Sequence, residues 1–129
     1  MQLKKASDIM THPVVSVRPD ARLTDAIKLM LRHHISGLPV VAADGRLVGV
    51  ITEHDIINLA ISGDAEDTTV EETMTREVIS FPPDANLAKL AATLGSRRIR
   101  RVPIVENGVV VGVVSRRDIL REVLFLYAE

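Results

Sequence analysis

The sequence of 129 residues contains no cysteine and no tryptophan. Without cysteine the chain can form no disulfide, zinc–thiolate site or thiol nucleophile, and a reducing, cytoplasmic location is expected. Aromatic residues make up only 2% of the chain, which leaves no stacking platform for single-stranded nucleic acid. The formal net charge of -1 gives no overall basic field, so nucleic-acid binding is a minor hypothesis that the salt dependence of binding would test.

Long apolar stretches are also missing. The unbroken apolar runs are far shorter than the ~18 residues needed to span a bilayer, and residues 1–13 lack the apolar run of a signal peptide, so no membrane association is expected. Hydrophobic residues nevertheless make up 47% of the chain and charged residues 26%, which is typical of a folded protein. The length suits one ordinary domain, or two very small ones that share a core.

The chain contains two copies of one pattern. The recurring segments are Met10-Thr11 with Met74-Thr75, Pro19-Asp20-Ala21 with Pro83-Asp84-Ala85, and Val48-Gly49-Val50 with Val111-Gly112-Val113. Self-similarity over this length indicates a duplication. We expect a first repeat at residues 1–61, a solvated linker at 62–69 and a second repeat at 70–129.

Each repeat is predicted to run strand, helix, hairpin, helix. The first strands are expected at residues 14–17 and 78–81, and amphipathic helices begin near Leu23 and Leu87. Asp44-Gly45 and Asn107-Gly108 predict two hairpins, because these pairs tolerate positive φ. Second helices are expected at residues 53–61 and 116–127. The predicted class is α+β, with two β-α-β-β-α repeats packed about a pseudo-twofold axis, since a repeat of about 50 residues is marginal alone.

Both hairpins lead into the pattern Ser/Thr-x-x-Asp, at Thr52 to Asp55 and at Ser115 to Asp118. One interpretation is a capping box that only begins a helix. The other is a capping box whose acid also contacts a ligand, because both copies carry Asp where Glu or Gln is usual. We expect an exposed carboxylate here, which would suit two vicinal hydroxyls, as in a ribose.

Arginines are concentrated around the second hairpin. The cluster consists of Arg97, Arg98, Arg100, Arg101, Arg116 and Arg117. A solvated face is one interpretation; the other is a phosphate site, because the hairpin returns the chain and can bring the flanking arginines together. The first copy has Ser36-Gly37 and Glu53-His54 at the positions of Arg100-Arg101 and Arg116-Arg117, so the two sites are expected to be unequal.

The sequence contains no pattern typical of a metal site or a catalytic site. His12, His33, His34 and His54 lack the spacing of metal ligands, so no metal is expected. A Gly-rich phosphate loop, a nucleophile elbow and paired catalytic carboxylates are also missing, and the chain is not expected to be an enzyme. Gly49 and Gly112 indicate either close approach of a ligand to the backbone or a bulge.

These residues resemble a known family. The segments 8–11, 35–41 and 45–56, and their counterparts in the second copy, are similar to the cystathionine-β-synthase (CBS) domain, here as the tandem pair called a Bateman module. The resemblance implies a regulatory module that binds AMP, ADP, ATP or a related effector in clefts between the repeats. It assigns Asp55 and Asp118 to the ribose, with Thr52 and Ser115 beside them.

The resemblance also assigns the other parts of the ligand. Phosphate is assigned to Arg100 and Arg101, with only Ser36 and Gly37 in the first copy, and Arg116 and Arg117 are added as nearby cations. Adenine is assigned to Thr11 through Val14 and Thr75 through Val78. A homodimer through residues 116–127 and an unidentified regulated protein are further implications. The runner-up is a ligand-free dimerisation scaffold, and the choice among AMP, ADP, ATP, S-adenosylmethionine and NAD stays open.

Overall fold

The computed structural model of the chain describes residues 4–63, 67–96 and 99–127. The chain divides into two compact units, which are described separately. Unit 1 consists of Met1–Val14 and Ile79–Glu129, and unit 2 consists of Val15–Val78. Each unit therefore combines the hairpin and longer helices of one sequence repeat with the opening segment of the other. Within the expected linker, residues 64–66 lie outside the described residues, as do Arg97 and Arg98 of the arginine cluster.

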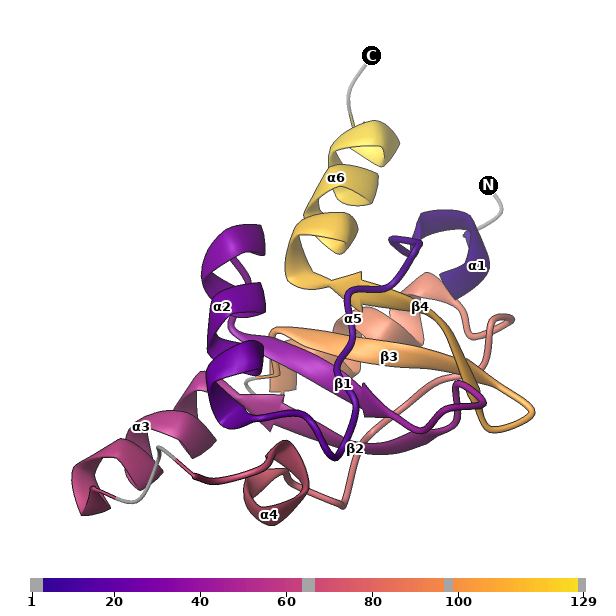
Figure 1. Cartoon of the computed structure of the whole chain (residues 1–129). Coiled ribbons are helices and arrows are strands. Elements are labelled where there is room, and N and C mark those ends of the chain that lie inside the picture. Colours follow the sequence, from indigo (N-terminus) through magenta and orange to yellow (C-terminus); the bar gives the residue numbers. More distant parts are fainter. Residues whose placement is uncertain (1–3, 64–66, 97–98, 128–129) are drawn as a thin grey trace. The chain divides into compact units, whose positions relative to one another are not determined.

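Unit 1 is built on the second hairpin (Figure 1). Its elements are α1 (Ala6–Ile9), α5 (Leu87–Ser96), β3 (Arg101–Glu106), β4 (Val109–Ser115) and α6 (Arg116–Tyr127). β3 and β4 are antiparallel, and their register runs from Arg101 opposite Ser115 to Glu106 opposite Val109. Asn107 and Gly108 have φ values of 53° and 83° in the turn, which confirms the predicted hairpin.

Unit 2 repeats this arrangement with the first hairpin. Its elements are α2 (Leu23–His33), β1 (Gly37–Val41), β2 (Leu47–Thr52), α3 (Glu53–Ser62) and α4 (Val70–Thr73). β1 and β2 pair from Gly37 opposite Thr52 to Val41 opposite Leu47. Gly45 has a φ of 87° in the connecting turn, as the Asp-Gly pair predicts. The expected mixed α+β class is confirmed.

The first strand of each repeat is much shorter than expected. Val17 forms a single parallel bridge with Val40, and Phe81 forms one with Ile104. The prolines that follow lack an N–H donor and end the pairing. Among the described residues, the bridge at Val17 and the bridge at Phe81 are the only ladder pairs of these two segments. The expected strands at 14–17 and 78–81 are therefore reduced to one bridging residue each. The sequence pattern did not predict the short helices α1 and α4.

Each unit has its own hydrophobic core. In unit 1 the fully buried side chains include Leu90, Ile104 and Val114, and in unit 2 they include Leu23, Leu38, Val40 and Ile51. The predicted apolar stripe of α2 is only partly buried, because Leu31 is 71% exposed while Leu23, Ala26 and Met30 face the core. Within the described ranges, every helix is too short or too polar to cross a bilayer.

The opening segments are tied to their units by backbone hydrogen bonds. In unit 1, Ala6 N–H donates to Ala85 O at 2.7 Å and Thr11 N–H donates to Val113 O at 2.8 Å. In unit 2, Val70 N–H donates to Ala21 O at 2.9 Å and Thr75 N–H donates to Val50 O at 2.8 Å. These bonds bring a Met-Thr pair of one repeat against the hairpin of the other.

Candidate functional site

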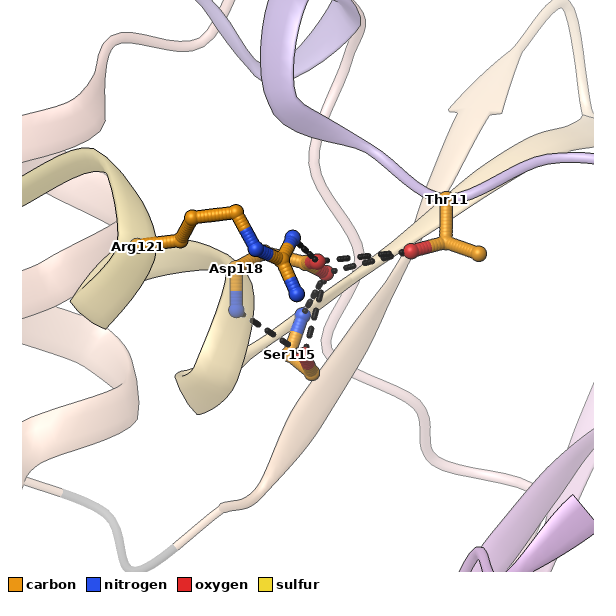
Figure 2. A network of polar contacts seen from close by, with 4 residues as sticks. All are labelled: Thr11, Ser115, Asp118 and Arg121. Carbon is orange, nitrogen blue, oxygen red and sulfur yellow. Dashed lines mark hydrogen bonds and ion pairs between the residues drawn. The ribbon is translucent and has the colours of Figure 1, made fainter. Parts of the chain in front are cut away.

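A reciprocal capping box begins α6, the helix that follows β4. Ser115 N–H donates to Asp118 Oδ2 at 2.8 Å, and Asp118 N–H donates back to Ser115 Oγ at 3.2 Å. The Ser115 hydroxyl also donates to Asp118 Oδ2 at 3.0 Å (Figure 2). The capping interpretation of the Ser-x-x-Asp pattern is therefore confirmed. The cap uses one carboxylate oxygen, Oδ2, and fixes the direction of the other.

Thr11 contacts the same carboxylate from a distant part of the chain. Its hydroxyl lies 3.3 Å from Oδ1 and 3.4 Å from Oδ2 of Asp118. An antiparallel bridge between Thr11 and Val113 positions the threonine beside the end of β4. Sequence reasoning selected Thr11 but did not predict this contact. The recurrence of Met-Thr in both copies was the available signal.

Unit 2 contains the same arrangement. Thr52 N–H and the Thr52 hydroxyl both donate to Asp55 Oδ2 at 3.0 Å, and Asp55 N–H donates to Thr52 Oγ1 at 3.3 Å. Thr75 donates to Asp55 Oδ1 at 3.4 Å. The bridge that places Thr75 joins it to Val50. In both units, Oδ2 is committed to the cap and Oδ1 receives a long contact from a threonine.

The two aspartates differ in exposure. Asp118 is buried, with 5% of its surface accessible, whereas Asp55 is half-buried. The expectation of an exposed carboxylate is therefore wrong for Asp118. The reason is tertiary, because the segment that carries Thr11 covers the start of α6. A buried carboxylate needs several donors, and Asp118 has them.

Glycines allow this segment to approach the hairpins. A methyl group at Gly112 would come within 2.7 Å of Met10 Cγ, and one at Gly49 would come within 2.9 Å of the Thr75 carbonyl oxygen. The strand register also shifts beside both glycines, between Ile104 and Val105 and between Val40 and Val41. The bulge interpretation of these glycines is confirmed. The backbone approach is to the chain itself, next to a bulge.

The arginines of unit 1 divide into different roles. Arg116 Nε donates to Ile99 O at 3.0 Å, and its Nη2 donates to Leu94 O at 3.0 Å. Arg116 therefore binds carbonyls at the end of α5 and beyond it. Arg100 and Arg117 are exposed, and within the described residues their side chains form no hydrogen bond or ion pair. The hairpin does bring the two arginine pairs together, because Arg116 N–H donates to Arg100 O at 2.9 Å, but the Arg116 side chain binds the carbonyls at the end of α5 and beyond it.

Arg101 lies beside the capping box, because it pairs with Ser115 in the hairpin. It starts β3 opposite Ser115 and is half-buried. Burial lowers the pKa of its guanidinium, and the nearby charge of Asp118 acts in the opposite direction. Unit 2 has Gly37 at this position, opposite Thr52, and half-buried Ser36 before it. The two units therefore differ in charge as the sequence predicts.

Sequence reasoning missed Arg121 altogether. Its Nη1 forms an ion pair with Asp118 Oδ1 at 3.2 Å, three residues along the same helix (Figure 2). The side chain of Arg121 is 62% exposed, whereas that of Asp118 is 5% exposed. The spacing of three residues on a predicted helix was a usable signal.

The remaining predicted residues lie in the same two units. Val14 is half-buried in the segment that carries Thr11, and Val78 is half-buried in the segment that carries Thr75. Unit 1 thus contains Thr11, Val14 and the Asp118 motif, and unit 2 contains Thr75, Val78 and the Asp55 motif. Among the residues that the structure describes, no three acidic or histidine side chains are grouped so as to hold a metal ion.

Comparisons with known proteins agree with the repeat. The family model of the CBS domain matches residues 6–62 and again 69–124. An uncharacterized 17.7 kDa protein of Acidianus ambivalens is 35% identical over 121 residues, which cover 93% of this chain and 73% of that protein. Other relatives are longer: the chain covers 41% of an uncharacterized protein and 23% of an inosine-5'-monophosphate dehydrogenase, both from Methanocaldococcus jannaschii.

Two solved structures of CBS proteins with bound ligands are also similar. CBSX2 in complex with AMP gives a TM-score of 0.86 at 26% identity and covers 95% of this chain and 97% of its own. The CBS domain pair of MJ0100, in complex with 5-methylthioadenosine and S-adenosyl-L-methionine, gives a TM-score of 0.83 at 32% identity, with 95% of this chain and 97% of its own covered.

Proposed function

The chain belongs to the CBS domain family, and on that premise we propose that it is a regulatory module that binds an adenosine-containing ligand and performs no catalysis. AMP, ADP and ATP are the proposed effectors. Two similar solved proteins hold AMP or S-adenosyl-L-methionine and methylthioadenosine, which supports an adenosine ligand of some kind. All of these molecules share a ribose and an adenine, so the proposal depends on groups that recognise them.

One observation supports this proposal most directly. In each unit a capping box commits Oδ2 of an aspartate to the helix, while the contacts that the described residues make to Oδ1 are 3.2 Å or longer. A carboxylate oxygen accepts about two hydrogen bonds. Oδ1 of Asp55 therefore has a position left for a sugar hydroxyl, and Oδ1 of Asp118 gains one when one of its two long contacts is displaced. A charged acceptor of this kind contributes about 1.5–3 kcal/mol. We assign Asp118 and Asp55 to the ribose, with Ser115 and Thr52 beside them.

The rest of the ligand is assigned by charge and position. Arg100, Arg101 and Arg117 are proposed to attract the phosphates in unit 1, because two are exposed and the third adjoins Asp118. Unit 2 offers only Ser36 and Gly37, so its ligand should carry less negative charge. The adenine is assigned to residues 11–14 in unit 1 and to residues 75–78 in unit 2, whose half-buried valines provide aliphatic contact.

Helix α6 is proposed to mediate a homodimer. Ile119 and Glu122 of this helix are buried within unit 1, and Leu126 packs against its core. The remaining apolar side chains stay accessible: Leu120 (66%), Val123 (37%), Leu124 (66%), Phe125 (70%) and Tyr127 (81%). Burying such a surface against a second copy is favourable at about 25 cal/mol per Å² of apolar area.

Isothermal titration calorimetry with AMP and ATP tests the ligand assignment. In Asp118→Glu and Asp55→Glu the capping acid is kept in its commoner form, but the carboxylate moves by one methylene. We expect each variant to remain folded with its helix cap, with a stability loss that is larger for the buried Asp118 than for Asp55, and to lose one binding event or weaken it about tenfold. If both variants bind like the wild type, the aspartates do not contact the ligand.

The second candidate is a ligand-free interaction scaffold. The complete capping boxes favour it, because hydrogen bonds to Ser115 and Thr52 already give both aspartates a structural role. This candidate predicts that adenosine, AMP, ATP, NAD and S-adenosylmethionine all leave the melting temperature of the wild type unchanged. A shift with any one of them excludes it.

A further inference from the structure

Arg121 contacts the carboxylate oxygen that the proposed ribose site requires. Asp118 Oδ1 receives two contacts, one from the Thr11 hydroxyl at 3.3 Å and one from Arg121 Nη1 at 3.2 Å. Figure 2 shows the two side chains approaching the carboxylate from opposite sides. A carboxylate oxygen has two principal lone-pair directions. A sugar hydroxyl that binds Oδ1 must therefore displace one of these contacts.

The Arg121 contact is the one that a ligand hydroxyl can displace at a low cost in free energy. Its side chain is 62% exposed, so its guanidinium can return to water, whereas the backbone of Thr11 is held by the bridge to Val113. Asp118 is buried, but it keeps the donors of Ser115 and Thr11 when Arg121 leaves and gains the ligand hydroxyl, so the exchange costs little. We propose that Arg121 is a specificity-determining residue of unit 1, which competes with ligand hydroxyls for Asp118 Oδ1. The inference rests on the proposed function of this site.

The competition should favour anionic ligands. A neutral ligand such as adenosine displaces Arg121 without offering it a new partner. A phosphorylated ligand adds negative charge near the displaced guanidinium, whose long side chain lets it follow that charge. Arg121 therefore lowers the affinity for adenosine more than the affinity for AMP.

Unit 2 lacks this competitor. Asn58 stands at the position of Arg121, and its amide nitrogen lies 3.3 Å from His54 Nε2. Within the described residues, the contact to Asp55 Oδ1 comes from Thr75. The two sites should therefore differ in their preference for charged ligands through this helix position, in addition to the arginines before the hairpin.

Calorimetric titration with adenosine and with 2',3'-dideoxyadenosine tests the competition. The Asp55→Glu background is used, so that unit 1 provides the remaining site. Removing the competitor in Arg121→Ala should tighten adenosine binding about threefold, because the guanidinium that is lost is the solvent-exposed partner of the pair. Binding of 2',3'-dideoxyadenosine should not change, because it has no hydroxyls to place on Oδ1. Lys89→Ala is the matched control, since it removes an equal charge from an exposed position on α5 of unit 1 without freeing Oδ1.

The outcomes separate this inference from the proposed function. If adenosine binds the Asp55→Glu parent and Arg121→Ala does not tighten that binding, Arg121 is not a competitor. The ribose assignment still stands in that case. If dideoxyadenosine gains as much as adenosine, the effect is a general one of charge, and the inference is wrong. If no adenosine compound binds the wild type, the proposed function fails and the inference fails with it. The reciprocal variant Asn58→Arg, in a chain with intact Asp55, should weaken adenosine binding in unit 2.

Discussion

Thr11 Oγ1 lies 3.3 Å from Asp118 Oδ1, so a side chain near the start of the chain contacts a carboxylate near its end. Thr75 and Asp55 repeat this relationship at 3.4 Å in unit 2. The threonine belongs to one sequence repeat and the aspartate to the other in both cases. The duplication has therefore produced two units in which the opening segment of one repeat completes the polar cluster of the other.

Replacing Thr11 by valine tests how much this contact contributes to the free energy of unfolding. The change keeps the shape of the side chain but removes a donor from a buried carboxylate. We expect Thr11→Val to lower the free energy of unfolding by about 1 kcal/mol, measured by urea denaturation. Thr75→Val should cost less, because Asp55 is more exposed. An equal or larger loss in Thr75→Val would contradict the argument from burial.

Gly112 should tolerate no side chain while Met10 lies against it. Gly112→Ala is expected to reduce stability by about 1–3 kcal/mol, because the added methyl group overlaps Met10. Gly95→Ala is the matched control. Apart from its own helix and chain neighbours, no atom of the described residues lies within 4 Å of the added methyl group there, and alanine in α5 should raise stability by up to about 1 kcal/mol. Thermal unfolding measures the stability of both variants. If Gly112→Ala is as stable as Gly95→Ala, Met10 moves aside at no cost and the argument from overlap is wrong.

Two adjacent arginines should behave differently. Arg116→Ala removes donors from Leu94 O and Ile99 O and should cost about 1–2 kcal/mol of stability. Arg117→Ala should change stability by less than about 0.5 kcal/mol, because its side chain is exposed. ATP affinity should fall more in Arg117→Ala than in Arg116→Ala. Chemical denaturation and calorimetry on the two variants decide whether the roles are divided in this way.

Salt should distinguish the ligands of unit 1. ATP affinity is expected to decrease as ionic strength rises, because the exposed Arg100 and Arg117 act through screened charge. Adenosine affinity should change little under the same conditions. Titrations at low and high salt provide the measurement, and parallel curves for the two ligands would exclude a phosphate role for these arginines.

Leu124 should report on assembly. It is 66% exposed on α6, and a charge at this position opposes burial against a second copy. We expect Leu124→Glu to shift the protein toward a monomer in sedimentation equilibrium, with an unchanged circular dichroism spectrum. A wild type that is already monomeric, or a variant with the same mass in solution, would count against the dimer.

The local parts of the site followed from short sequence patterns. Asp-Gly and Asn-Gly turns, and the spacing of Thr52 and Asp55, depend only on neighbouring backbone, so both hairpins and both capping boxes were predictable. The length of the first strands was not, because Val17 and Phe81 pair with strands that come later in the chain. The carbonyl partners of Arg116 were missed for the same reason, since they belong to the end of α5 and the residues after it.

The sequence by itself determined the duplication, the order of the hairpin and the two longer helices in each repeat, and the residue types at the two Ser/Thr-x-x-Asp motifs, because each of these depends on contiguous residues. Only the tertiary structure decided that Thr11 contacts Asp118, that this carboxylate is buried and that the Arg116 side chain donates to backbone carbonyls. Those outcomes depend on contacts between segments far apart in the chain, which no local periodicity specifies. The ion pair of Arg121 depends on both: its spacing of three residues from Asp118 can be read from the sequence, but the burial of Asp118 comes from tertiary contacts.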